Sequence, residues 1–173
     1  LIKDARLLSV ENDTSKRYKS ERSWDFDVKF QGYRYHMSNI FAAIGRVQLK
    51  RFTSEFSIKR KQLLNCYKKS LIGNANVRMQ KTNSNDEIIP HIFPIRILNG
   101  SRDNLKQILA KNNIPTGIHY KPNHLLTFYG KGKLSLPITE KLYDQLLTLP
   151  LHPELREEEI KNICKIINAN TEI

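Results

Sequence analysis

The loop at residues 32–37 (Gly-Tyr-Arg-Tyr-His-Met) combines side chains that could bind a phosphate group. Arg34 and His36 alternate with Tyr33 and Tyr35, so in an extended loop the two polar groups share one side. An arginine is a strong phosphate ligand, and a histidine can bind phosphate when it is protonated. The loop is therefore a candidate contact for phosphate or nucleic acid, with a solvated surface loop as the alternative.

A second candidate lies around His119, Tyr120 and His124. The two histidines are separated across Pro122 and could converge on one ligand. A histidine can donate and accept hydrogen bonds near neutral pH, whereas Tyr120 can pack as an amphipathic wall. Strand alternation would send His119 and Tyr120 to opposite faces, so if only one of them reaches a ligand we expect it to be His119. The alternative is that both histidines are structural.

The common catalytic sequence patterns are absent from the chain. It contains no glycine-rich phosphate loop, no His-Glu-x-x-His, no Gly-x-Ser-x-Gly and no cysteine pair at metal spacing. Cys66 and Cys164 lie far apart on apparently amphipathic helices, which predicts packing roles and a reducing cytoplasm. No apolar run approaches the ~20 residues needed to span a bilayer. We therefore expect no metal site and no membrane partner.

The chain is strongly basic, with 29 Lys and Arg residues, 17 Asp and Glu residues and a net charge of +12. Such a charge attracts polyanions, among them nucleic acid, an acidic membrane surface and a nucleotide diphosphate. The alternative, favoured for the basic runs at 59–61 and 68–69, is a solvated helix face. Charge alone does not name a partner.

One long helix is predicted to follow the loop. Ser38 has the side chain of an N-cap residue. Apolar residues then recur at i, i+3, i+4 and i+7, in Ile40, Ala43, Ile44 and Val47. The pattern continues without proline through Phe52, Phe56, Leu63, Tyr67 and Leu71, and it stops at Gly73. A helix of this length would run roughly 50 Å at 1.5 Å per residue, so we expect it to link two bodies or to lie across an interface.

Shorter elements are predicted beyond the long helix. An apolar run at 88–98 predicts a strand, and Pro90 and Pro94 favour an edge position. The elements expected after it are a helix from Ser101 to Asn112, a strand at 114–120, a helix from Leu136 with Leu142, Leu146 and Leu147 buried, an extended connection at 149–153, and a last helix with Ile160, Ile163, Cys164 and Ile167 inward. This alternation predicts an α/β or α+β domain behind one long helix.

Four segments, in matching order, resemble the DegT/DnrJ/StrS family of sugar aminotransferases. The loop at 32–37 and the helix after it are similar to the family's Gly-Tyr-Asn-Tyr-Arg-Met loop and following helix. Residues 117–124 resemble, in compressed form, its Gly-Ile-x-x-x-His-Tyr-x-Pro-x-His segment. Leu136-Pro-x-x-Glu140 and the Leu-Thr-Leu-Pro-Leu-His-Pro run at 147–153 are similar to its Leu-Pro-x-x-Glu and Leu-Ser-Leu-Pro-x-His-Pro patterns.

The resemblance implies the C-terminal part of a fold-type I aminotransferase that uses pyridoxal phosphate (PLP). Residues 1–37 would be a remnant of the large PLP-binding domain with the active-site loop, 38–73 the long connecting helix, and 74–173 a small α/β domain with a small sheet covered by helices. A helix expected at 1–8 would be the one that follows the Schiff-base lysine. Because no lysine here sits in the family's lysine motif, we expect no catalytic residue and no transamination by this chain alone.

The resemblance also implies the chemistry of the intact enzyme. It would convert a nucleotide-linked keto-sugar into an amino-sugar with PLP and glutamate, for surface polysaccharide, lipopolysaccharide or related sugar synthesis in a bacterial cytoplasm. It would be a homodimer with shared active sites and would bind no specific nucleic acid. Arg34 and His36 would contact the cofactor phosphate or the substrate of the neighbouring subunit, and His119, Tyr120 and His124 would contact the sugar nucleotide.

Two departures from the family pattern concern the loop. The family's asparagine is Arg34 here, and its following arginine is His36. An arginine is a better phosphate ligand than an asparagine, so phosphate contact remains the expectation.

Two other classes of function stay open. One is a basic module that binds nucleic acid or an acidic surface, which would bind random oligonucleotides in a salt-sensitive way. The other is a catalytically dead relative with a structural or regulatory role.

Overall fold

The computed structural model describes residues 5–10, 19, 27–28, 30–82, 87–129 and 134–171. The chain divides into two compact units, residues 1–50 and 51–173. Part of the helix expected at 1–8 lies outside the described residues. Within the described part, Leu7 forms an isolated β-bridge with Arg34, and Leu8 and Ser9 have φ angles of 58° and 59°. The expected helix therefore does not extend to Leu8.

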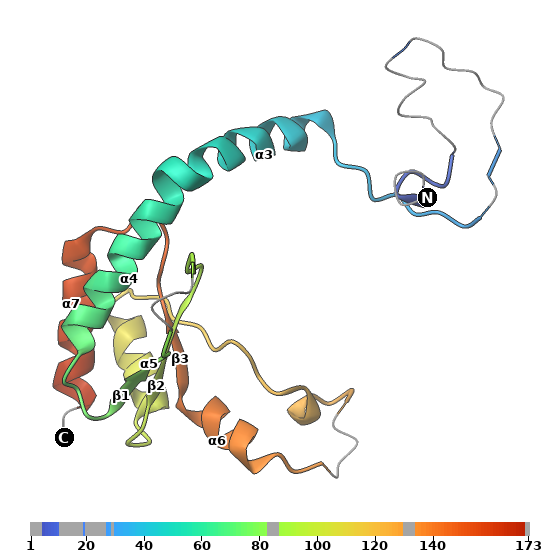
Figure 1. Ribbon diagram of the computed structural model, residues 1–173. Helices are drawn as coiled ribbons and strands as arrows, with labels where there is room; N and C mark the ends of the chain where they lie inside the picture. The colour runs from blue at the N-terminus through green and yellow to red at the C-terminus, as the bar shows by residue number, and fades with distance from the viewer. Residues whose placement is uncertain are drawn as a thin grey trace. The chain divides into compact units, whose positions relative to one another are not determined.

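The long helix predicted from Ser38 to Gly73 is present as three consecutive helical elements (Figure 1). In α3 (Asn39–Arg51), Ser38 Oγ accepts a backbone N–H of the first turn at 3.3 Å, which confirms the N-cap. A π-helical turn, η1 (Phe52–Phe56), leads into α4 (Ser57–Leu71). The helix ends before Gly73, whose φ of +100° is one that glycine adopts without strain.

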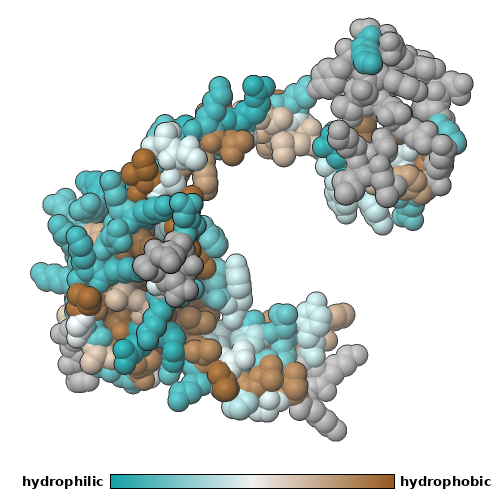
Figure 2. Space-filling model, viewed as in Figure 1, coloured by the Kyte–Doolittle hydropathy of each residue, from teal (hydrophilic) through white to brown (hydrophobic). Residues whose placement is uncertain are grey.

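The apolar face of α3 is exposed, and no described residue of this helix is buried. The exposed fractions are 73% for Ile40, 54% for Ile44 and 55% for Val47. Figure 2 shows hydrophobic patches along this helix, interrupted by hydrophilic side chains. α4 differs, because it buries three of the apolar residues that the periodicity predicts: Leu63, Tyr67 and Leu71.

A three-stranded antiparallel sheet forms the centre of the second unit, in the order β1-β2-β3. The strands are β1 (Val77–Met79), β2 (Phe93–Ile97) and β3 (Leu146–Leu149). The strand predicted at 88–98 is present as β2. It is the central strand, however, so the prediction of an edge position is wrong.

The register explains how the central strand accommodates Pro94. The N–H of Leu98 donates to Asn76 O at 2.9 Å, so hydrogen-bonded pairs between β1 and β2 recur at every second residue. Pro94 occupies the next such position, and β1 ends one residue short of it. On its other side Pro94 faces Thr148, whose N–H donates to Gly117 O at 2.7 Å instead. The missing N–H of the proline therefore costs no ladder hydrogen bond.

The third strand, β3, was not predicted from the sequence. Leu146 and Leu147 are expected above to continue the preceding helix, but that helix, α6 (Pro137–Gln145), ends before them. Leu147 is buried, as predicted, but on a strand, and Leu142 is only half-buried. The extended connection predicted from residue 149 therefore begins earlier, as a paired strand.

The hydrophobic core lies on one face of this sheet. Three helices cover that face: α4, α5 (Arg102–Lys111) and α7 (Glu157–Thr171) (Figure 1). Strand alternation directs Ile95, Ile97 and Leu147 into the core. The four residues predicted to point inward on the last helix are all buried there: Ile160, Ile163, Cys164 and Ile167. Each fully buried aliphatic side chain contributes about 1.5–3 kcal/mol.

Arg60 corrects the prediction of a solvated basic face on α4. Its Nη1 donates hydrogen bonds to the carbonyl oxygens of Pro90, His91 and Leu151, at 3.2, 3.1 and 3.1 Å. One guanidinium group therefore ties α4 to the chain that enters β2 and to the chain that leaves β3.

Both cysteines are free thiols near the contact between α4 and α7. Cys164 is buried, and burial together with the neighbouring Cys66 raises its pKa to about 12. Its thiol is therefore protonated at neutral pH, as suits a packing role. No helix in the described ranges is long and apolar enough to cross a membrane.

Candidate functional site

In the first unit, the loop at 32–37 is held by the backbone of residues near the start of the chain. The N–H groups of Tyr33 and Tyr35 donate to the carbonyls of Ala5 and Arg6, at 2.7 and 2.8 Å. These bonds fix every second residue of the loop in an extended conformation. The side chains of Arg34 and His36, which alternate with the two tyrosines, are exposed.

Gly32 is required by the close approach of this neighbouring segment. A Cβ atom at Gly32 would overlap the backbone nitrogen of Ser9 and the backbone carbonyl carbon of Leu8. Backbone atoms cannot move aside as a flexible side chain can, so any larger residue would displace the loop. The glycine therefore fixes where the following tyrosines and Arg34 lie.

Arg34 and His36 are both exposed in this loop. The rings of Tyr33 and Tyr35 stack with centroids 5.5 Å apart and planes 15° apart, as expected for neighbours on one side of an extended segment. Among the residues that the structure describes, Arg34 has no ion-pair partner. Its guanidinium is available to a phosphate group.

In the second unit, His119 lies against the sheet rather than in a strand of it. The strand predicted at 114–120 is reduced to one β-bridge, in which Gly117 and Thr148 exchange hydrogen bonds of 3.0 and 2.7 Å. His119 Nδ1 then lies 3.0 Å from Thr148 Oγ1. This leaves Nε2 of a half-buried imidazole available for a ligand.

His119 and Tyr120 do not lie on a strand, so the condition under which they would point to opposite faces is not met. Their ring centroids are 4.8 Å apart and their planes are 83° apart, an edge-to-face contact. The backbone is not a strand at this point, and period-two alternation therefore does not apply. Tyr120 is 75% exposed and can form one wall of a site beside His119.

His124 is bound to Glu140 rather than to His119. It lies in η2 (Asn123–Leu125), a short 3-10 helix, and its Nε2 is 2.9 Å from Glu140 Oε1. The same carboxylate oxygen accepts the N–H of Leu136 at 2.8 Å, at the first turn of α6. One glutamate therefore caps a helix and orients a histidine.

These contacts lower the pKa of the Glu140 carboxyl group. The backbone hydrogen bond from Leu136 is the larger cause and the hydrogen bond with His124 the next. Both favour the ionised form, so Glu140 is a carboxylate at neutral pH. A carboxylate acceptor also favours a proton on Nε2 of His124, which leaves Nδ1 to face any ligand.

The predicted site residues have different contacts. Arg34 and His36 belong to the first unit, His119 and Tyr120 touch each other in the second, and His124 is paired with Glu140. Thr148 and Glu140 were not predicted as site residues. Both occur in sequence patterns that carry the family resemblance, so the patterns themselves were the available signal. Within the described ranges, no group of three or more His, Cys, Asp or Glu side chains could hold a metal ion.

Solved structures of aminotransferases share this fold. PseC of Helicobacter pylori, an aminotransferase of pseudoaminic acid biosynthesis, superposes with a TM-score of 0.86 at 22% identity, over 99% of this chain and 45% of that one. The PMP form of the putative sugar aminotransferase Spr1654 of Streptococcus pneumoniae superposes with a TM-score of 0.82 at 28% identity, over 98% of this chain and 44% of that one. The small sheet and its helices are therefore the C-terminal portion of an aminotransferase fold.

The sequence comparisons define the family. The model of the DegT/DnrJ/EryC1/StrS aminotransferase family matches residues 1–168, and the chain belongs to this family. MJ1066 of Methanocaldococcus jannaschii is 30% identical over 98% of this chain and 47% of its own length. The UDP-4-amino-4,6-dideoxy-N-acetyl-beta-L-altrosamine transaminase of Campylobacter jejuni is 28% identical over 82% of this chain and 39% of its own length. The chain thus spans less than half the length of these relatives.

The described residues fit only one part of PLP, the cofactor implied by this family. Arg34 is an exposed guanidinium without an ion-pair partner in the described ranges, which suits the phosphate group. A Schiff-base lysine has to be activated by desolvation or by a cationic neighbour. None of the described lysines is buried. The described part of the chain therefore contains no lysine in the environment that a Schiff base with PLP requires.

Proposed function

We propose that the chain is the C-terminal portion of a PLP-dependent aminotransferase that converts a nucleotide-linked keto-sugar into an amino-sugar, with glutamate as amino donor. The observation that carries this proposal is the family match over residues 1–168. The Campylobacter jejuni relative, named as a transaminase of a UDP-linked amino-sugar, supports the substrate class. A role in surface polysaccharide, lipopolysaccharide or related sugar synthesis is part of the same proposal.

Arg34 and His36 contact the cofactor phosphate in the active site of a second subunit. The hydrogen bonds of Tyr33 and Tyr35 to residues 5–6 support this role, since they hold the loop extended while Arg34 stays exposed. A guanidinium pairs with phosphate oxygens through two parallel hydrogen bonds, which an asparagine cannot do. Arg34, in place of the asparagine of the family pattern, therefore strengthens the contact with the cofactor phosphate.

His119 and Tyr120 hold the sugar nucleotide. Thr148 fixes the His119 ring through Nδ1, so Nε2 can donate to or accept from a sugar hydroxyl. Tyr120 supplies an exposed ring beside it. His124 can reach the same ligand only through Nδ1, because Nε2 is bound to Glu140. Its main effect is to fix the segment that carries the other two.

The Schiff-base lysine lies in the part of the relatives that the chain does not span. By itself the chain therefore does not transaminate, because the aldimine and its electron sink have to be together. Residues 1–37 belong to the large domain, 38–73 connect, and 74–173 form the small domain. The active unit is a cytoplasmic homodimer, and the exposed apolar face of α3 and the free cysteines support that setting.

The test is amino transfer by the product of the complete coding sequence. The purified protein is loaded with PLP and given ¹⁵N-glutamate and a panel of UDP-, GDP- and dTDP-linked keto-sugars. We expect ¹⁵N in one amino-sugar by mass spectrometry. If bound PLP does not respond to glutamate and no sugar gains ¹⁵N, the proposed function is wrong.

The same assay tests the role of His119. His119→Ala should raise the Michaelis constant for the sugar nucleotide or lower turnover, while PLP uptake stays unchanged. His91→Ala is the matched control, because this side chain is exposed. Unchanged kinetics with a lower melting temperature in His119→Ala would show that His119 serves only packing.

A further inference from the structure

Two arginines lie directly opposite each other on neighbouring strands of the sheet. The register pairs Arg78 of β1 with Arg96 of β2. The hydrogen bond between Leu98 and Asn76 places this pair at a hydrogen-bonded position, where the Cα atoms are about 5.5 Å apart and both side chains stand on the same face. Like charges directly opposite each other destabilise a sheet. The pair therefore needs a compensating interaction.

The protein supplies little of that compensation within its described residues. Arg96 donates from Nε and Nη2 to Gln145 Oε1, at 3.0 and 2.7 Å, but the amide is neutral. The Arg78 side chain is exposed and has no hydrogen-bond or ion-pair partner among the described residues. Gln145 thus holds one guanidinium in place, and no side chain of the described residues holds the other.

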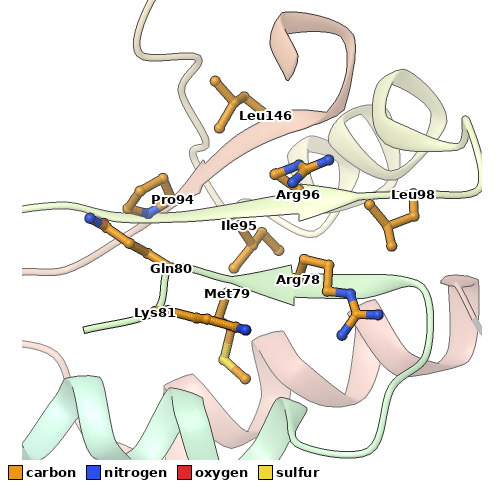
Figure 3. Close-up of a pocket in the computed structure, with 9 residues that line it drawn as sticks. All are labelled: Arg78, Met79, Gln80, Lys81, Pro94, Ile95, Arg96, Leu98 and Leu146. Carbon is orange, nitrogen blue, oxygen red and sulfur yellow. The ribbon is translucent and has the colours of Figure 1, made fainter. Parts of the chain in front are cut away.

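Both arginines line a hollow of about 660 Å³ on the sheet. Figure 3 shows Arg78 on β1 and Arg96 on β2, with Leu146 coming from β3. Pro94, Leu98 and Leu146 give the hollow apolar walls. Gln80 and Lys81 also line the hollow, so its wall is apolar on one part and polar on another.

The arginines stand on the face of the sheet opposite the core, since their neighbours Ile95 and Ile97 point inward. A charged residue on an edge strand can prevent that strand from pairing with another molecule. Arg78 on the edge strand β1 could do this without Arg96. That role does not account for Arg96, because β2 is the central strand. Nor does it account for the amide that fixes the Arg96 guanidinium.

We propose that the hollow between Arg78 and Arg96 binds the phosphate group of a small organic phosphate ester. The Arg78 side chain, whose guanidinium group points away from Arg96 in Figure 3, turns towards it so that both groups bind the phosphate oxygens, and the apolar walls receive the organic part of the molecule. A nucleic acid backbone would require a charged groove that follows the strand over several nucleotides, whereas the cations of this hollow are Arg78, Arg96 and Lys81. This site does not depend on the aminotransferase function.

The probes are inorganic phosphate and phenyl phosphate, titrated into the full 173-residue chain by isothermal calorimetry at low salt. Phenyl phosphate should bind more tightly than inorganic phosphate, because its ring lies against the apolar walls. Arg78→Gln should weaken binding of both about tenfold, the effect of losing one charge-assisted contact. Arg96→Gln should weaken it as much or more.

Arg46→Gln is the matched control, because it removes the same charge from an exposed position on α3. It should leave phenyl phosphate binding unchanged. Arg78→Gln keeps the test valid even if Arg96→Gln perturbs the fold, since the Arg78 side chain is exposed and has no partner among the residues that the structure describes. The proposal is overturned if phenyl phosphate does not bind at millimolar concentration, or if Arg46→Gln weakens it as much as Arg78→Gln. It is also overturned if a random oligonucleotide binds more tightly than phenyl phosphate and depends on Arg78.

Discussion

The imidazole of His119 reaches back over Gly117 to Thr148, with Nδ1 and Oγ1 3.0 Å apart. This contact is possible because Gly117 has no side chain and because its backbone is paired with Thr148. A histidine that could have been mobile at the end of an irregular segment is thereby fixed on the sheet, with one ring nitrogen left for a ligand.

Gly117→Ala should break this arrangement. The new Cβ would lie 2.7 Å from Cε1 and 3.3 Å from Nδ1 of His119, so the ring has to leave Thr148. We expect a changed ¹⁵N chemical shift for His119 Nδ1 and a loss of about 1 kcal/mol, the value of one hydrogen bond. Gly45→Ala is the control, because a Cβ there meets no atom within 4 Å and alanine favours the helix. An unchanged His119 shift in Gly117→Ala would contradict the assigned contact.

The hydrogen bonds of Glu140 with Leu136 and His124 should make the free energy of unfolding depend on pH. The folded-state pKa of Glu140 is lowered from 4.5, so its contribution is fully present above that value and is lost as the pH falls through the folded-state pKa. In thermal unfolding, wild type should exceed Glu140→Gln in melting temperature near neutral pH, and the difference should shrink in acid. A difference that stays constant or grows with acidification would show that the carboxylate is not stabilised.

Arg60→Gln should destabilise the second unit by about 2 kcal/mol, because hydrogen bonds from a charged group are worth roughly 1.5–3 kcal/mol and three carbonyl oxygens lose their donor. Chemical denaturation gives the free energy of unfolding. Lys61→Gln is the control, since Lys61 is exposed beside Arg60 and surface changes cost within about 0.5 kcal/mol. Equal effects of the two substitutions would mean that the three contacts of Arg60 contribute nothing beyond surface charge.

The exposed apolar face of α3 should cause self-association. Ile40 and Ile44 are 73% and 54% exposed, and neighbouring turns of the helix repeat the pattern. Sedimentation velocity over a range of concentrations should show a shift towards dimer, which the double substitution Ile40→Gln and Ile44→Gln should reduce. A compact monomer without concentration dependence would count against this expectation.

The elements that could be predicted are those specified by local signals. The helices from Ser101 and Glu157 have clear apolar periodicity and ends, and both formed as expected. The sequence around Leu146 has no such break, because no glycine or proline separates α6 from β3 and Leu142 and Leu146 keep a helical spacing. The central place of β2 depends on its register with β1 and β3, which Pro94 by itself could not reveal.

The candidate site shows the same limit. Arg34 and His119 could be found from residue type and from family patterns, because those are written in short segments. The partner of His119 is Thr148, 29 residues away, and that of His124 is Glu140, 16 residues away. Such contacts arise from packing between elements, and local spacing does not encode them.

The most direct measurement is reductive trapping of PLP on the chain itself. The purified 173-residue protein is mixed with PLP, reduced with borohydride, digested and mapped by mass spectrometry. Because none of the described lysines is buried, we predict scattered labelling well below one equivalent, spread over exposed lysines. Stoichiometric labelling of one lysine would show that the chain holds its own Schiff-base position, and would contradict its assignment as the portion that complements the lysine-bearing domain.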